Sequence, residues 1–163
     1  MNTPTSFVLH KDSSNAFNPA VVGQKAMGLA RLPKPWTPEY FVVTNLAFDC
    51  WAESEPSQAD DYILEVAKQI NETVSKWTSH PLQLILRSSA THETLADRGR
   101  LTSYPLPADF TEEAIANRVQ RIYLEAYRDE NMGSCAILVQ RYIQGLLGHL
   151  SNERRVSKTV NQW

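Results

Sequence analysis

The chain has 163 residues and a mass of 18.5 kDa, enough for one domain with a hydrophobic core. With 42% hydrophobic and 21% charged residues, its composition excludes a disordered chain, a collagen-like repeat and a coiled coil. The net charge of -2 argues against general nucleic-acid binding, and no apolar run approaches the roughly 18 residues that a membrane span needs.

The cysteines and the start of the chain bear on the cellular compartment. Cys50 and Cys135 form neither a CxxC pair nor a zinc-binding spacing. The first residues, MNTPTSFVLHKDSS, contain no basic region followed by an apolar stretch, as a signal peptide would. We therefore expect a cytoplasmic protein with reduced thiols that carries no metal site of its own and binds neither nucleic acid nor a membrane.

The first half of the chain predicts two strands and two helices. Residues Phe7–His10 form a short apolar run, and Tyr40–Thr44 is rich in β-branched and aromatic residues, so both segments are expected to be strands. Gly23–Leu32 has the apolar spacing of a helix. A short helix is expected over Asn45–Trp51, with its first residue as the N-terminal cap.

The second half predicts two more helices and two more strands. The helices are Asp60–Trp77 and a segment from Thr111, the expected cap, to Tyr127. The strands are Leu82–Ala90 and Cys135–Ile143. This alternation predicts an α/β (α+β) fold with a mixed sheet flanked by helices. The first of these helices is expected to pack on the sheet through Ile63, Ile70 and Val74.

Two cations stand where an anion would bind. Lys25 follows Gly23 at the start of a helix, where backbone N–H groups and the helix dipole favour negative charge. The alternative is an ordinary solvated lysine. Arg87 ends an apolar strand and precedes a turn that contains Ser88 and Ser89, so it needs either a phosphate or a carboxylate as its partner. A structural ion pair with Glu93 would satisfy it equally well.

The segment DRGRLTS, residues 97–103, reads as a basic loop around Gly99. Such a loop can close over phosphates, but it can also be simply exposed. No GxSxG, HExxH or GxxxxGK[ST] motif occurs in the chain.

Several segments together resemble one family. VGQKAMGLARL, PEYFVVTNLAFDCW, LILRSSATHETL and AIANRVQRIYLEAYRDENMGSCAILVQRYI are similar, in the same order, to segments of the N-terminal ATP-binding domain of phosphoenolpyruvate synthase and pyruvate phosphate dikinase. The resemblance covers residues 21–148. It implies the first lobe of an ATP-grasp-like domain over residues 1–148, with residues 149–163 as the start of a second lobe or a tail. The family's dikinases act on pyruvate, water and other acceptors.

The resemblance also implies roles for individual residues. Lys25 and Arg87 match the family's phosphate-binding lysine and arginine, and Arg87 would act in catalysis. Gly99 matches the glycine of the loop that covers the phosphates. Gln140 matches a glutamine beside the adenine, where the backbone of Val139 and its neighbours would read the base edge. The implied cofactors are ATP and Mg²⁺, the latter held by residues outside this chain.

The departures from the family pattern leave two hypotheses open. The loop after RSSATHETL is shorter and more basic than the family's, and no acidic metal-binding pair, phosphohistidine domain or pyruvate barrel matches this sequence. The chain is therefore expected to be either the ATP-binding part of a dikinase whose catalytic histidine lies elsewhere, or a non-catalytic module that binds a nucleotide or a partner. The coding frame after Trp163 would separate these hypotheses.

Overall fold

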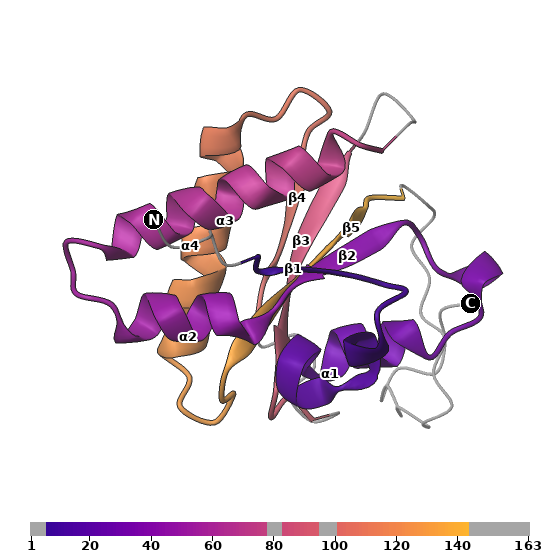
Figure 1. The fold of residues 1–163 in the computed structure, drawn as a ribbon, viewed down its shortest axis with the longest axis horizontal. Helices are drawn as coiled ribbons and strands as arrows, with labels where there is room; N and C mark the ends of the chain where they lie inside the picture. Colours follow the sequence, from indigo (N-terminus) through magenta and orange to yellow (C-terminus); the bar gives the residue numbers. More distant parts are fainter. Residues whose placement is uncertain (1–5, 78–82, 95–100, 144–163) are drawn as a thin grey trace, which may run out of the picture.

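The computed structural model describes residues 6–77, 83–94 and 101–143. One sheet carries helices on both of its faces (Figure 1). Its strands are β1 (Val8–His10), β2 (Tyr40–Val43), β3 (Leu84–Ala90), β4 (Ser103–Leu106) and β5 (Cys135–Arg141). The helices are α1 (Pro19–Ala30), α2 (Asn45–Glu53), α3 (Ala59–Val74) and α4 (Glu112–Tyr127), with 3-10 turns η1 (Ser14–Phe17) and η2 (Lys34–Trp36). These elements confirm the predicted α+β class.

The sheet differs from the prediction in strand direction. Its order is β1-β2-β5-β3-β4, and every pairing between the described strands is antiparallel, so the expected mixed sheet is wrong. The reason lies in β5, which returns after α4 to the position between β2 and β3 and runs antiparallel to both. The strand β4 was missed because Pro105 interrupts its pattern. Proline is tolerated there because β4 lies at the sheet edge.

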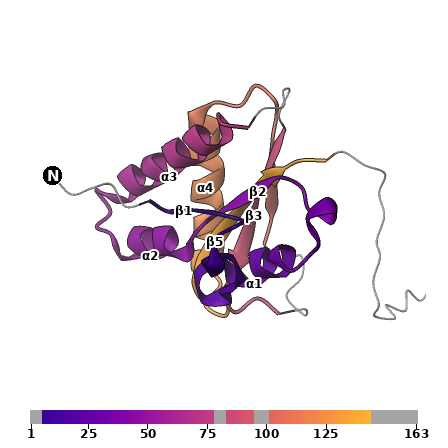
Figure 2. The ribbon, with the colours of Figure 1, turned by 45° about the vertical axis from the view of Figure 1, so that its right-hand side comes forward.

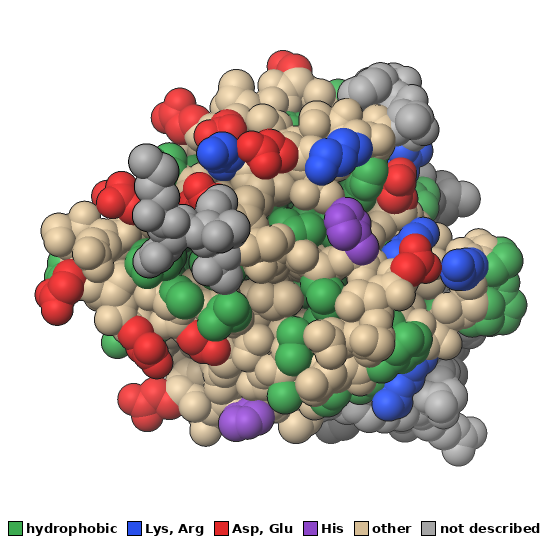
Figure 3. All heavy atoms as spheres, viewed as in Figure 1, with side chains coloured by type: hydrophobic (Ala, Val, Ile, Leu, Met, Phe, Trp, Pro, Cys, Tyr) green, Lys and Arg blue, Asp and Glu red, His purple; other side chains and the backbone are tan. Residues whose placement is uncertain are grey.

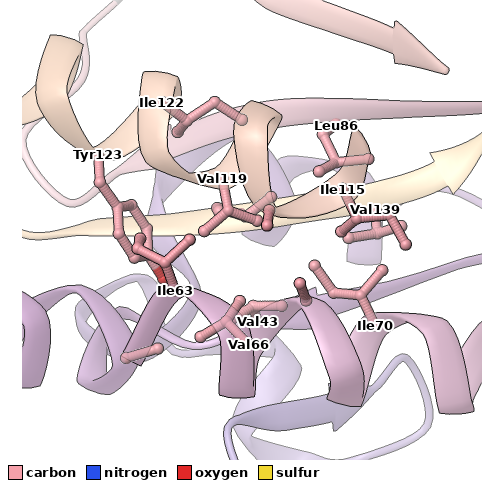
Figure 4. Close-up of a cluster of buried hydrophobic side chains, with 14 of the residues drawn as sticks. Val43, Ile63, Val66, Ile70, Leu86, Ile115, Val119, Ile122, Tyr123 and Val139 are labelled. Carbon is pink, nitrogen blue, oxygen red and sulfur yellow. The ribbon is translucent and has the colours of Figure 1, made fainter. Parts of the chain in front are cut away.

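Helices α2, α3 and α4 cover one face of the sheet, and α1 covers the other (Figures 1 and 2). Figure 4 shows the larger core, where Ile63, Val66 and Ile70 of α3 meet α4 and the inward side chains of the sheet. Ile63, Ile70 and Val74 are all nearly or completely buried, which confirms the predicted apolar face of α3. That helix ends at Val74, three residues before the predicted end at Trp77.

The residues that cap the N-termini of α4 and α2 can be identified from the structure. Thr111 caps α4 as predicted, because its side chain accepts a hydrogen bond from the backbone N–H of Ala114 at 3.1 Å. The predicted cap of α2 is wrong. Thr44 occupies the cap position, and the side chain of Asn45 instead donates to the carbonyl of Ala20 in α1 at 2.8 Å.

The α1 face has a smaller core of its own. It is formed by Val22, Ala26, Tyr40, Val42, Ala136 and Leu138. No helix in the described part of the chain is both long and apolar enough to cross a membrane.

Candidate functional site

The helix α1 is broken at Gly23. This residue has φ 75° and ψ 170°, a left-handed backbone conformation that glycine adopts without a steric penalty. The short segment before the break is capped by Asn18, whose side chain accepts from the N–H of Ala20 at 3.0 Å. The regular helix that carries Lys25 begins after the break, in agreement with the predicted start at Gly23.

The hydroxyl of Ser89 bridges this break. It donates to the carbonyl of Val22 at 2.7 Å and accepts from the N–H of Ala26 at 3.0 Å. Ser89 is fully buried, so both backbone groups depend on it for a partner. The sequence suggested that the Ser89 hydroxyl could face an anion. In the structure this hydroxyl instead bonds two backbone groups of α1. A Cβ on Gly23 would overlap the Ser89 carbonyl, which explains why glycine stands there.

Two further contacts join α1 to the turn after β3. The amide of Gln24 donates to the carbonyl of Thr91 at 3.0 Å, and Lys25 Nζ donates to the carbonyl of Ser88 at 2.7 Å. The turn itself is held by Gly133, which has φ 67° and leaves room for Thr91 and His92 beside it. The segments VGQKA and RSSATHE therefore form one interlocked unit.

Lys25 has an anionic partner within this unit. Its Nζ lies 3.1 Å from Oε1 of Glu93, and the side chains expose 24% and 9% of their surface respectively. The other carboxylate oxygen, Oε2, is buried and has no hydrogen-bond partner within the described residues. Glu93 thus pairs with Lys25, and the alternative ion pair between Arg87 and Glu93 is wrong.

Arg87 is half-buried on the α1 side of the sheet. Side chains alternate along a strand, so Arg87 shares its face with Ser89, which contacts α1. Its Nε is buried without a hydrogen-bond partner, and no carboxylate within the described residues pairs with the guanidinium. Lys25, on the helix that covers this face, bonds the carbonyl of the next residue, Ser88, so its ammonium lies beside β3 one residue along from Arg87.

The remaining predicted residues divide between the two faces. Gln140 is half-buried and pairs with Tyr40 and Ile85, which places it on the face of Arg87. Val139 is fully buried in the opposite core, and its backbone lies between β2 and β3. A base edge therefore has no access to Val139 within the strand. Gly99 lies outside the described residues.

A buried thiol lies beside the backbone of Ser89. Burial raises the pKa of the Cys135 thiol to about 12, although a hydrogen bond involving the Ser89 backbone and the charge of Lys25 act in the opposite direction. The described residues contain no group of three or more side chains that could hold a metal ion. On the face seen in Figure 3, acidic side chains predominate at the left, and basic side chains lie toward the top and right.

Neither a protein-family model nor a curated protein sequence matches this chain.

Proposed function

We propose that this chain is the ATP-binding part of a dikinase-type phosphotransferase related to phosphoenolpyruvate synthase. In this proposal phosphate passes from ATP to an acceptor through a catalytic histidine located elsewhere. The support comes from the two segments that carry the family resemblance, VGQKA and RSSATHE. Although they are more than 60 residues apart in sequence, their side chains and backbones bond directly to each other.

The observation that carries the proposal is the guanidinium of Arg87. A half-buried arginine that pairs with no carboxylate of the described residues is unfavourable unless an anion binds it. The planar guanidinium matches two phosphate oxygens at once. An anion is therefore the ligand that fits this position, and a nucleotide phosphate is the anion that the resemblance implies.

The neighbouring residues fit a polyphosphate next to Arg87. Lys25 projects from α1 on the same face and would contribute a second positive charge, while the amide of Gln140 lies further along this face. When bound, ATP supplies the transferable phosphoryl group. Arg87 and Lys25 would orient the phosphates and stabilise the charge that is redistributed during transfer. We expect the Mg²⁺ ligands, the phosphate acceptor and the rest of the ATP contacts to come from other domains or a partner chain.

A second candidate is a non-catalytic module that binds a nucleotide or a partner. The ion pair of Lys25 favours this candidate. Glu93, 3.1 Å away, already neutralises part of the lysine charge that would otherwise act on a phosphate. We place either protein in the cytoplasm, because both Cys50 and Cys135 are free thiols. Consumption of ATP by the natural protein that contains this lobe would favour the dikinase over the module.

The test of ATP binding uses NMR, which detects weak binding and reports the residues involved. We expect millimolar ATP to shift the amide signals of Gly23–Ala26, Ser88–Glu93 and the Arg87 Nε–H. Arg87→Ala should abolish the shifts. The matched control is Arg118→Ala. It removes another half-buried arginine whose Nε has no hydrogen-bond partner among the described residues, and whose Cζ lies 5.9 Å from the centroid of the Tyr104 ring. Shifts that survive Arg87→Ala, or that centre elsewhere, would contradict the proposal.

A further inference from the structure

Glu93 is the anion that Lys25 contacts in this fold. Its side chain exposes only 9% of its surface, whereas that of Lys25 exposes 24%. The carboxylate is therefore withdrawn from water while the ammonium still reaches the surface. Two donor directions of the ammonium are used, one by Oε1 of Glu93 at 3.1 Å and one by the carbonyl of Ser88 at 2.7 Å. An ammonium has three donors, and no described residue occupies the third, so a ligand oxygen could bind there.

The second oxygen of Glu93 is left without a donor. Oε2 is buried and accepts no hydrogen bond from any described residue. A buried carboxylate is normally surrounded by several donors, because desolvation of its charge is otherwise poorly compensated. Within the described part of the chain, Lys25 is the one cation that pairs with Glu93. The same ammonium would have to serve both this carboxylate and an incoming phosphate.

We propose that Glu93 is a positioning residue that also competes with phosphate for Lys25, so that its charge sets how tightly this lobe binds a polyphosphate. This inference rests on the proposed ATP-binding function. A phosphate oxygen bound to the third donor of Lys25 would lie near the Glu93 carboxylate. Two negative charges that share one ammonium repel each other, and the repulsion is stronger where water is excluded. Arg87 has no such competitor among the described residues.

A purely structural role for Glu93 makes the opposite prediction. If the carboxylate only fastened the turn after β3 to α1, its neutralisation would loosen Lys25 and weaken phosphate binding. If the carboxylate competes, its neutralisation strengthens binding. The direction of the change in affinity therefore separates the two roles, whereas a change in thermal stability does not.

The experiment compares Glu93→Gln with the unchanged 163-residue chain. Glutamine keeps the length of the side chain and an acceptor oxygen for Lys25, and it removes only the charge. Sodium tripolyphosphate and ATP are titrated separately, with binding followed by NMR and calorimetry. We expect Glu93→Gln to bind both probes at least ten times more tightly than the unchanged chain, and Arg87→Ala in the same background to reverse this gain.

Asp12→Asn is the matched control, because it removes one negative charge from another lysine pair. Asp12 lies 3.4 Å from Lys34, but these side chains expose 69% and 85% of their surface. Solvent and salt screen such a pair, so the affinity should change by less than about twofold. An equal gain in Asp12→Asn would show that net charge alone is responsible, and it would overturn the proposal.

The other outcomes separate the inference from the function on which it rests. If the unchanged chain binds tripolyphosphate and Glu93→Gln binds it equally or more weakly, competition by Glu93 is wrong and the ATP site stands. If neither protein binds either probe, both proposals fail. Glu93→Ala is the second variant, and it too should bind more tightly. If neither Glu93 variant folds, as judged by circular dichroism, Glu93 is a structural residue and the inference is overturned.

Discussion

Gly23 and Ser89 lie so close together that each restricts which amino acid can occupy the other position. Gly23 has a left-handed φ of 75°, and a Cβ at this position would overlap the carbonyl of Ser89 and come within 2.5 Å of its Oγ. The Ser89 hydroxyl in turn bonds the carbonyl of Val22 and the N–H of Ala26, on either side of the glycine. The close approach of α1 to β3, and with it the position of Lys25, depends on this contact.

Gly23→Ala should therefore destabilise the protein by at least about 2 kcal/mol, because alanine disfavours the left-handed conformation and its methyl group overlaps β3. The control is Gly28→Ala in the same helix, where a Cβ meets no atom within 4 Å. That variant should be stabilised by about 0.5–1 kcal/mol through its better helix propensity. Urea unfolding of both variants measures the difference, and similar stabilities would contradict the role given to Gly23.

Ser89→Ala should cost about 2–4 kcal/mol, since it leaves a buried carbonyl and a buried N–H without their partner. The adjacent residue provides the control. Ser88 is also buried, but its Oγ has no hydrogen-bond partner within the described residues, so Ser88→Ala should change the stability by less than about 1 kcal/mol. Equal losses in urea unfolding would show that the Ser89 bridge contributes little.

Lys25→Met and Arg87→Met should differ in stability, although each replaces a cation by an apolar side chain of similar length. Lys25→Met leaves the carboxylate of Glu93 buried and unpaired, which we expect to cost about 3 kcal/mol. Arg87→Met leaves no carboxylate of the described residues without its partner, so it should lower the free energy of unfolding by less than about 1 kcal/mol. Denaturant unfolding at pH 7 tests this, and a larger loss for Arg87→Met would indicate an acidic partner that the described residues do not include.

If this chain is part of a dikinase, as we propose, Arg87→Ala should have its main effect on catalysis by the full-length protein. We expect turnover to fall at least about a hundredfold, which is the usual consequence of removing one well-placed electrostatic donor. The fold should survive, because Arg87 pairs with no carboxylate in the described part of the chain. Turnover and melting temperature measured on the same variant check both parts, and an active but easily melted variant would show that Arg87 is structural.

The pH dependence of stability should contain a contribution from Cys135. Burial raises its pKa from 9.0 to about 12 in the folded protein, so between these values the unfolded state loses the proton first. Stability that is fully present below about pH 9 is therefore lost as the pH rises towards 12, by at most about 1.4 kcal/mol per pH unit.

Cys135→Ala removes this contribution, together with the smaller effect of the Cys135 charge on the pKa of Tyr123, which burial mainly raises. The stability of the unchanged chain should fall more steeply above pH 9 than that of Cys135→Ala. Parallel curves from urea unfolding between pH 8 and pH 11 would rule out the effect. At pH 8 the thiol of Cys50, which is half-exposed, should react with thiol reagents before that of Cys135.

Local patterns were sufficient for most of the elements. The spacing of Ile63, Ile70 and Val74 predicted the buried face of α3, and Thr111 predicted the start of α4. These features depend on helix periodicity and on hydrogen bonds between near neighbours in the chain. The strand β4 escaped this reasoning, because Pro105 is acceptable only at a sheet edge and the sequence does not show which strand lies at the edge.

What only the tertiary structure decided is the assignment of partners. The sequence marked Lys25 and Arg87 as candidates for an anion site and Glu93 as an alternative partner of Arg87. It could not show that Glu93 bonds Lys25, or that no carboxylate of the described residues pairs with Arg87. It showed hydroxyls at Ser88 and Ser89 but not that they point to opposite faces of the sheet. Charge and polarity are properties of single residues. Pairing depends on strand order, register and the close approach of α1 to β3, all of which arise from contacts between distant segments.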